Sequence, residues 1–218
     1  MLEAIAAGRT RLNEIKQVTG LEGATAYLKT LQDLQLVERV VPATERQPYK
    51  SRRGLYRLRD HFFRFWFRFV HPHRTLLERG GVQAALDTLV APQIEAFTGP
   101  VFEEVCRQFL WRIGLAGELP FLPLRIGSWW RANEEVDIVA VGQGAALLAE
   151  CKWTRRPVGT NILQNLERKA GLVSRELGGS RLYYGLCARS GFTPRLEQEA
   201  ARRGDLLLFD LDRIVAGE

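Results

Sequence analysis

The chain has 218 residues, of which 46% are hydrophobic and 26% charged, so it carries enough apolar side chains for a packed core. Its net charge of +6 favours a polyanionic partner such as nucleic acid. No apolar run approaches the roughly 18 residues of a membrane span, and no secretory leader is recognisable. The three cysteines, Cys106, Cys151 and Cys187, form no CxxC or Cys/His motif. Their spacing therefore predicts neither a zinc site nor a disulfide framework, and it is typical of a cytoplasmic protein.

The first sixty residues predict three helices followed by a hairpin. Apolar side chains recur at helical spacing in three segments, and two later runs have the composition of strands. The helices are expected over 1–7, 10–20 and 24–36, and the strands over 37–41 and 54–58. This order is typical of a winged helix-turn-helix, to which we assign residues 1–60.

The loop of this hairpin is strongly basic. No acidic residue lies between Arg46 and Arg59, and the stretch includes Lys50, Arg52 and Arg53. One interpretation is contact with nucleic-acid phosphates. The alternatives are a solvated loop or a docking surface for an acidic protein. The helix over 24–36 offers few side chains suited to base edges, so non-specific contact or a structural role is favoured over sequence-specific readout.

Residues 61–98 predict a helical linker that is rich in aromatic side chains. Asp60 is placed to cap its first helix. Seven ring-bearing residues follow within nine positions: His61, Phe62, Phe63, Phe65, Trp66, Phe67 and Phe69. This density favours burial between two domains, and a base-stacking platform is the alternative.

From residue 99 the pattern alternates between helix and strand. Helices are expected over 99–113, 161–177 and 194–203, and strands over 126–131, 135–141, 145–152, 182–187 and 206–210. This order predicts an α/β domain with a central mixed sheet over residues 99–218.

Two of these strands form a hairpin that carries charged residues in apolar surroundings. If Gln143-Gly144 makes a two-residue turn, Asp137 lies opposite Glu150, and Lys152 shares the face of Glu150. The other face is expected to be core and consists of Val136, Ile138, Ala140, Leu147, Ala149 and Cys151.

Two neighbouring buried carboxylates repel each other and are costly to desolvate. A divalent cation such as Mg²⁺ or Mn²⁺, which prefers hard oxygen ligands, relieves both problems. Lys152 could then orient a water molecule or stabilise negative charge. The structural alternative is a salt bridge of Glu150 with Lys152 or Arg155.

This arrangement resembles the PD-(D/E)xK nuclease superfamily. Glu150-Cys151-Lys152 matches its ExK triplet and Asp137 its preceding aspartate, although Val136 stands where the motif has proline. The resemblance implies a restriction-endonuclease-like domain and a Mg²⁺-dependent endonuclease that hydrolyses phosphodiester bonds in DNA. It also implies metal ligation by Glu103, Asp137, Glu150 and the Cys151 carbonyl, with Lys169 as an accessory residue.

A closer resemblance covers nearly the whole chain. It rests on several separated motifs: Arg53-Gly54-Leu55-Tyr56-Arg57-Leu58-Arg59-Asp60, Phe65-Trp66-Phe67-Arg68-Phe69-Val70, Gly99 with Phe102-Glu103, Trp129-Trp130, Glu135-Val136-Asp137 and Glu150-Cys151-Lys152-Trp153-Thr154. These are similar to the domain of unknown function 234, which follows the ATPase module in archaeal-type AAA+ ATPases.

That resemblance implies an AAA+ ATPase module as a partner, in cis or in trans. The phosphate-binding motif GxxxxGK[ST] does not occur here, so no ATP site is expected in this chain. The leading hypothesis is a metal-dependent nuclease-like domain joined to a winged helix. The alternatives are a catalytically inactive regulatory or interaction module of an ATPase and a winged-helix DNA-binding regulator.

Overall fold

The computed structural model describes residues 1–216 and divides the chain into two compact units. The first unit comprises Met1–Val41 and Tyr49–Ile94. The second comprises Pro42–Pro48 and the chain from Glu95 onward. Most of the predicted linker over 61–98 therefore falls within the first unit, and part of the predicted hairpin loop belongs to the second.

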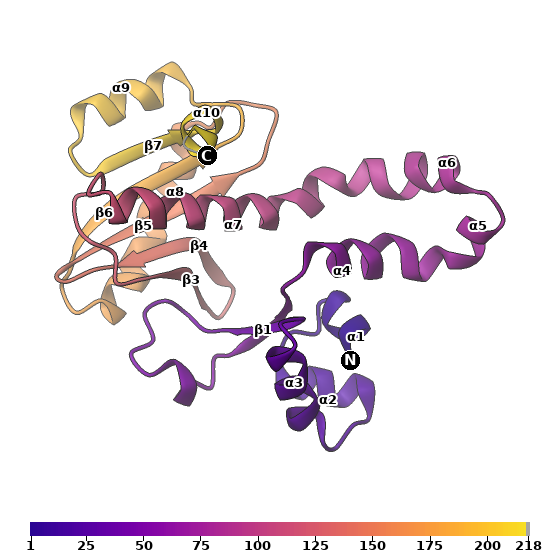
Figure 1. Cartoon of the computed structure of the whole chain (residues 1–218). Coiled ribbons are helices and arrows are strands. Elements are labelled where there is room, and N and C mark those ends of the chain that lie inside the picture. The colour runs from indigo at the N-terminus through magenta and orange to yellow at the C-terminus, as the bar shows by residue number, and fades with distance from the viewer. Residues whose placement is uncertain (217–218) are drawn as a thin grey trace. The chain divides into compact units, whose positions relative to one another are not determined.

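The first unit begins with the expected order of three helices and a hairpin (Figure 1). These elements are α1 (Leu2–Ala6), α2 (Leu12–Thr19), α3 (Ala24–Asp33), β1 (Val37–Val40) and β2 (Leu55–Leu58). The two strands pair antiparallel. Apolar side chains from all five elements form one buried cluster: Ile5, Ile15, Leu28, Val37, Tyr56 and Leu58. The helical spacing thus identifies part of the core: Ile15 and Leu28 are buried, whereas Val18, Tyr27 and Leu34 are exposed.

The aromatic segment continues the first unit as a series of short helices. Asp60 caps α4 (His61–Phe65), since its carboxylate accepts hydrogen bonds from the Phe62 and Phe63 backbone at 2.7 and 3.3 Å. Further elements are α5 (Arg74–Glu78) and α6 (Val82–Ala85). Phe63 and Phe67 stack on each other and pack against the N-terminal core, whereas Phe62 is exposed. At least these two rings therefore contribute to the core of their own unit.

The second unit is built around a five-stranded mixed sheet, as predicted. Its elements are α7 (Ile94–Leu115), β3 (Arg125–Arg131), β4 (Glu134–Val141), β5 (Ala145–Lys152), α8 (Thr160–Val173), β6 (Arg181–Ala188), α9 (Pro194–Arg202), β7 (Leu206–Asp210) and α10 (Leu211–Val215). The strands lie in the order β3-β4-β5-β6-β7. Strand β4 pairs antiparallel with both β3 and β5, whereas β5, β6 and β7 are parallel to one another.

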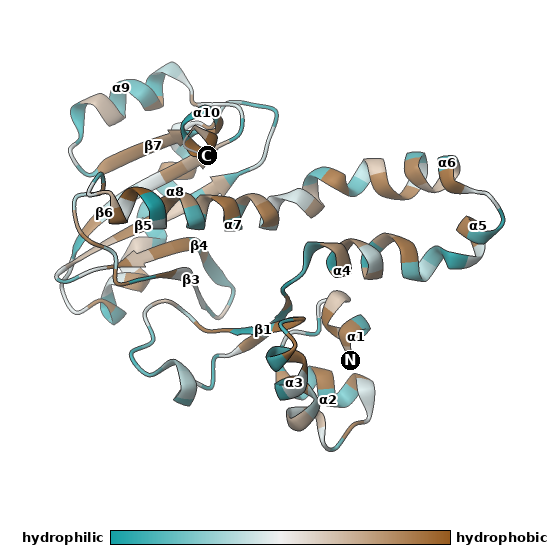
Figure 2. Cartoon of the chain, viewed as in Figure 1, coloured by the Kyte–Doolittle hydropathy of each residue, from teal (hydrophilic) through white to brown (hydrophobic). Residues whose placement is uncertain are grey.

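Both faces of this sheet are buried by helices. Helices α7 and α10 contribute to one apolar cluster, which includes Phe102, Cys106, Phe109, Leu147, Cys187 and Ile214. Helices α8 and α9 contribute to the other, which includes Val136, Val139, Leu148, Leu163, Leu166 and Leu196. Hydrophobic residues accordingly run along the strands, while α9 is largely hydrophilic (Figure 2). The layered arrangement explains why β5 reads as an almost continuous apolar run.

Helix α7 begins earlier than predicted. The expected start was Gly99, but the helix begins at Ile94 and continues through Pro100. Proline already has a helical φ and removes one backbone donor, so its presence marks a helix boundary only when the preceding residue leaves the helical region. The prediction of the helix itself is confirmed, whereas its start was wrong.

A β-bulge interrupts the pairing of β3 with β4. Gly127 pairs with Val139, and Trp129 pairs with Val136. Between these pairs, one residue on β3 therefore lies opposite two residues on β4. The additional residue falls at Asp137–Ile138. Val136 therefore joins the cluster beneath α8, whereas Ile138 joins the cluster beneath α7. The expectation that both side chains share one face was wrong, because strict alternation fails at a bulge.

Candidate metal centre

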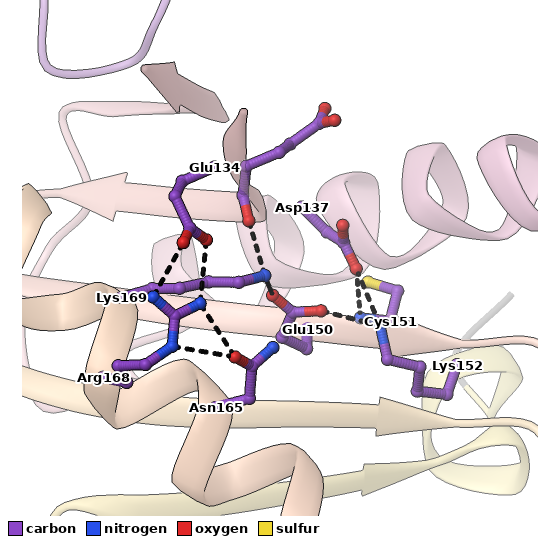
Figure 3. A network of polar contacts seen from close by, with 9 residues as sticks. Glu134, Asp137, Glu150, Cys151, Lys152, Asn165, Arg168 and Lys169 are labelled. Atoms are coloured by element: carbon purple, nitrogen blue, oxygen red, sulfur yellow. Dashed lines mark hydrogen bonds and ion pairs between the residues drawn. The ribbon is translucent and has the colours of Figure 1, made fainter. Parts of the chain in front are cut away.

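Three charged side chains converge where β4 and β5 run side by side (Figure 3). The Lys152 Nζ atom lies 2.6 Å from Glu150 Oε2 and 3.6 Å from Asp137 Oδ2. Glu150 is only 4% exposed, while Asp137 and Lys152 are partly buried. The structure thus brings together the three residues that were predicted from the sequence to be catalytic.

The register of the hairpin produces this convergence. The Gly142 N–H donates to the Ala145 carbonyl at 2.9 Å, and four further pairs run from Val141–Ala146 to Ile138–Ala149. This is the predicted register, and Asp137 lies one residue beyond the last pair. The bulge displaces its backbone at this point, which is a common way of redirecting a side chain.

The Asp137 side chain takes the place of a backbone partner for β5. Its Oδ2 atom accepts a hydrogen bond of 2.8 Å from the Cys151 N–H. The N–H and C=O of one strand residue point toward the same neighbouring strand. The Cys151 carbonyl therefore also faces the β4 side of β5, where the two carboxylates gather.

Lys169 on α8 belongs to the same network. Its Nζ atom donates to Glu150 Oε1 at 2.7 Å and to the Glu135 carbonyl at 2.6 Å. Its side chain is 12% exposed. Only an accessory role was expected for it. The sequence feature that points to Lys169 is its position beside Leu166 and Ala170 on the apolar stripe of α8, where a buried ammonium group requires a polar or charged partner.

A more exposed pair joins the same strand and helix. Arg168 donates to both oxygens of Glu134 at 2.7 and 2.9 Å and also to Asn165 (Figure 3). This bidentate geometry is specific, but the solvent exposure of the ion pair limits its contribution to stability. Its consequence is to fix α8 against the start of β4, which keeps Lys169 above Glu150.

The two carboxyl groups differ in their electrostatic surroundings. Burial raises the pKa of Asp137, and the neighbouring Glu150 charge raises it further, to about 6. Burial also opposes ionisation of Glu150, but the Lys152 and Lys169 ammonium groups outweigh it and lower its pKa. Despite its own burial, Lys152 has a raised pKa because of Asp137 and Glu150. The site therefore holds one firmly ionised carboxylate and one that takes up a proton readily.

The structural alternative considered for Glu150 is present in part. Glu150 forms an ion pair with Lys152, whereas Arg155 lies 2.5 Å from Glu95 instead. With Lys169 included, two carboxylates are matched by two ammonium groups. Charge balance in this arrangement is therefore reached by the protein's own side chains.

Glu103 lies on α7, beside the C-terminal end of β5. Its neighbour Phe102 contacts Trp153, with ring centroids 5.2 Å apart, and Cys106 one turn later reaches Cys151. Glu103 is partly buried. Its predicted role as a metal ligand stays a prediction.

The four basic residues predicted to bind nucleic acid are divided between the two units. Arg46 belongs to the second unit, whereas Lys50, Arg52 and Arg53 belong to the first. Arg46, Lys50 and Arg52 are exposed, and Arg53 is partly buried. Their role in binding stays a prediction, and each unit would contribute its own part.

The three cysteines were missed as a group. Cys106, Cys151 and Cys187 are all buried, and their sulfur atoms lie within 4.8 Å of one another. Their spacing in the sequence did not reveal this cluster, because residues on one helix and two strands meet only when the sheet is assembled.

None of the helices in residues 1–216 combines the length and apolar character needed to cross a bilayer.

Comparison with known proteins gives three similarities. An uncharacterized protein of Methanocaldococcus jannaschii is 35% identical over 219 residues, which cover 97% of this chain and 46% of that protein. The chain thus spans about half the length of this relative. A repair endonuclease from Pyrococcus abyssi aligns with 50% of this chain and 46% of its own at 19% identity, but the TM-score of 0.37 carries no argument about fold or activity.

The third similarity is to a protein family and covers residues 66–169. This region includes part of the aromatic segment, the whole β4–β5 hairpin and most of α8. It therefore contains Asp137, Glu150, Lys152 and Lys169. Residues 66–169 match the model of a family described as archaeal and bacterial proteins of unknown function, the domain of unknown function 234.

Proposed function

We propose that the second unit is a nuclease-like domain that hydrolyses phosphodiester bonds in DNA with the help of Mg²⁺ or Mn²⁺. The observation that carries this proposal is the convergence of Asp137, Glu150 and Lys152 at one point of the mainly apolar β4–β5 hairpin. Such a combination of buried charges is expensive to maintain, which favours a function over a purely structural origin.

The donor set fits a hard divalent cation. The Asp137 and Glu150 carboxylates and the Cys151 carbonyl offer oxygen atoms on the same side of β5, and Mg²⁺ prefers such ligands together with water. Burial and the neighbouring Glu150 charge disfavour the ionised form of Asp137 and raise its pKa. A bound cation would stabilise that ionised form, lower the pKa of a water molecule and offset charge on the phosphate.

The residues of the chain have distinct roles in this proposal. Lys152 is firmly charged and would hold the attacking water or stabilise the negative charge that develops on the phosphate. Glu150 and Asp137 would hold the cation, and Glu103 would add a ligand from α7. Lys169 would position Glu150 through the contact that it already makes.

The N-terminal part is proposed to deliver the substrate. Its helix and hairpin order is consistent with a winged helix, and Arg46, Lys50, Arg52 and Arg53 would contact phosphates without reading sequence. An AAA+ ATPase module would act as a partner, in cis or in trans. The relative from M. jannaschii is about twice as long as the matched region, which leaves room for such a module in that protein.

A non-catalytic interaction module is the second candidate, because the charges of the site are already balanced. Glu150 has a lysine 2.6 Å from one oxygen and another 2.7 Å from the other. A buried ion-pair network of this kind can be purely structural. This candidate predicts that neither Mg²⁺ nor Mn²⁺ binds at the carboxylates.

The test is cleavage of supercoiled and linear DNA in the presence of Mg²⁺ or Mn²⁺. The wild-type chain should nick or cut, and Asp137→Asn and Lys152→Ala should lower the rate by at least about 100-fold. Glu118→Gln, which alters an exposed carboxylate away from the site, is the matched control and should leave the rate unchanged. Nicking that persists in the two site variants would contradict the assignment of Asp137 and Lys152 to a nuclease site.

A further inference from the structure

All three cysteines of the chain meet at one point beneath α7. Cys151 on β5 and Cys187 on β6 are register partners on neighbouring parallel strands. Cys106 approaches them from α7. The three sulfur atoms lie within 4.8 Å of one another, although the residues are widely separated in sequence.

The surroundings of this thiol cluster are apolar. Cys106 and Cys187 are completely buried and Cys151 is 8% exposed. They pack in the cluster that also contains Phe102, Ile138 and Leu147. Ligation by three sulfurs in a water-poor site selects against hard cations such as Mg²⁺ and favours soft ones such as Cu⁺ and Zn²⁺.

The spacing of the sulfurs suits such a cation with little movement. A zinc–sulfur bond of about 2.3 Å separates two sulfurs of a tetrahedral site by about 3.8 Å. This separation is within the 4.8 Å that contains the cluster. One helix and two adjacent strands would have to close by no more than about 1 Å, which packed elements allow on binding.

We propose that Cys106, Cys151 and Cys187 form a binding site for one thiophilic d¹⁰ cation, Cu⁺ or Zn²⁺, held by three sulfur atoms. This site is distinct from the oxygen-lined centre and does not depend on it. Each cysteine that binds as a thiolate releases its proton to solvent. In residues 1–216, no fourth histidine, cysteine or carboxylate joins the group, which favours Cu⁺, since closed zinc sites take four ligands.

Cys151 connects the two sites. Its side chain lies in the thiol cluster, while its backbone N–H donates to Asp137 Oδ2. A cation held by the sulfur of Cys151 would restrain the backbone between Glu150 and Lys152. The soft-metal site would thereby stiffen the strand that carries the oxygen ligands.

The experiment loads the full chain, kept reduced by a phosphine, with Cu⁺ or Zn²⁺ under anaerobic conditions in separate arms. After desalting, metal content and X-ray absorption are measured. One equivalent of Cu⁺ should be retained, with about three sulfurs at roughly 2.3 Å, and Zn²⁺ should be retained more weakly. Retention of neither cation, or a coordination shell without sulfur, would overturn the proposal, and this readout needs no folded variant.

Variants then locate the site. Cys106→Ala and Cys187→Ala should each reduce affinity for the retained cation at least tenfold, with folding checked by circular dichroism. Cys151 is left intact because its backbone also serves the oxygen-lined centre. Asp137→Asn is the matched control and should retain the cation. Loss of the cation in Asp137→Asn with retention in both cysteine variants would assign it to the carboxylates and refute the proposal, whatever the outcome for DNA cleavage.

Discussion

Glu150 is the residue on which the candidate centre depends most. It is almost completely buried, and its two oxygens are each held by a different lysine. A buried ion pair adds little net stability while complete, but removal of one partner leaves an uncompensated charge. The lysines therefore stabilise the carboxylate in the absence of a cation and define what a cation would have to replace.

This dependence predicts the effect of Lys169→Met. The free energy of unfolding should fall by about 3 kcal/mol, because Glu150 stays buried with half of its compensation. Millimolar Mn²⁺ should restore part of this stability, since a cation can take over the role of the ammonium group. Denaturant unfolding with and without Mn²⁺ measures both effects.

Arg168→Met is the matched control for this prediction. It lies next to Lys169 on α8 and forms an ion pair of similar length, but its side chain is 55% exposed. Its removal should cost less than about 1 kcal/mol and should not respond to Mn²⁺. Equal destabilisation in the two variants would contradict the special position of Glu150.

Asp137 predicts how metal binding depends on pH. Its pKa is raised to about 6, so the folded protein holds a proton there below this pH. A cation must displace that proton, and its apparent affinity should fall about tenfold per pH unit as pH decreases below 6. Above pH 6 the affinity should level off. Calorimetric titration of Mn²⁺ between pH 5 and 8 gives the profile, and a flat one would contradict this role of Asp137.

At the scale of elements, the β4–β5 turn sets the relative positions of Asp137, Glu150 and Cys151. Gly144 has a φ of +70°, a conformation that costs other residues roughly 1 kcal/mol, and a Cβ there would meet no atom within 4 Å. Gly144→Ala should therefore destabilise the fold by about 1 kcal/mol through backbone strain alone. Thermal unfolding measures this change.

Gly171 provides the opposite case in the same unit. It lies in α8, and a Cβ there would also meet no atom within 4 Å, but its φ is not positive. Gly171→Ala should stabilise the protein by about 0.5–1 kcal/mol, because alanine loses less freedom in a helix. If both substitutions destabilised the protein, steric contact of the added Cβ, and not backbone conformation, would determine which residues these positions tolerate.

The elements show which features local sequence can predict. The hairpin register followed from Gln143-Gly144 and alternation, and β5 and β7 have the predicted bounds. The bulge at Asp137 could not be predicted in this way, because it arises from pairing with β3. Helix α7 begins at Ile94, five residues before the predicted start at Gly99, and α10 was not predicted because it has a single turn.

At the scale of the molecule, interactions between distant segments escaped prediction. Lys169 reaches Glu150 only because α8 packs across β5, and the three cysteines meet only in the folded sheet. Apolar patterns reveal which face of an element is buried, but not which elements meet. The convergence of Asp137, Glu150 and Lys152 could be predicted because all three lie on one hairpin, where the strand register alone brings them together.

The net positive charge predicts salt-dependent DNA binding without sequence preference. Lys50→Glu with Arg52→Glu should weaken binding to unrelated duplexes equally. The slope of log affinity against log salt concentration should decrease by about one for each phosphate that the protein no longer neutralises. Fluorescence anisotropy across a range of salt concentrations measures both.

Arg195→Glu, on the exposed side of α9, is the control for a change of charge elsewhere. It should alter affinity less than a change in the basic loop. If the loop variant lost affinity for one DNA sequence but kept its affinity for unrelated duplexes, the result would instead favour a sequence-specific regulator.

Binding of a divalent cation by Asp137 and Glu150 underlies every role proposed for the centre. The most direct measurement is anomalous diffraction from crystals soaked in Mn²⁺, compared between the wild-type chain and Asp137→Asn. We expect one manganese peak in the wild type, bound by both carboxylates and the Cys151 carbonyl, and no peak in the variant. Wild-type crystals without such a peak, in which Lys152 and Lys169 still form ion pairs with Glu150, would contradict metal binding at this site.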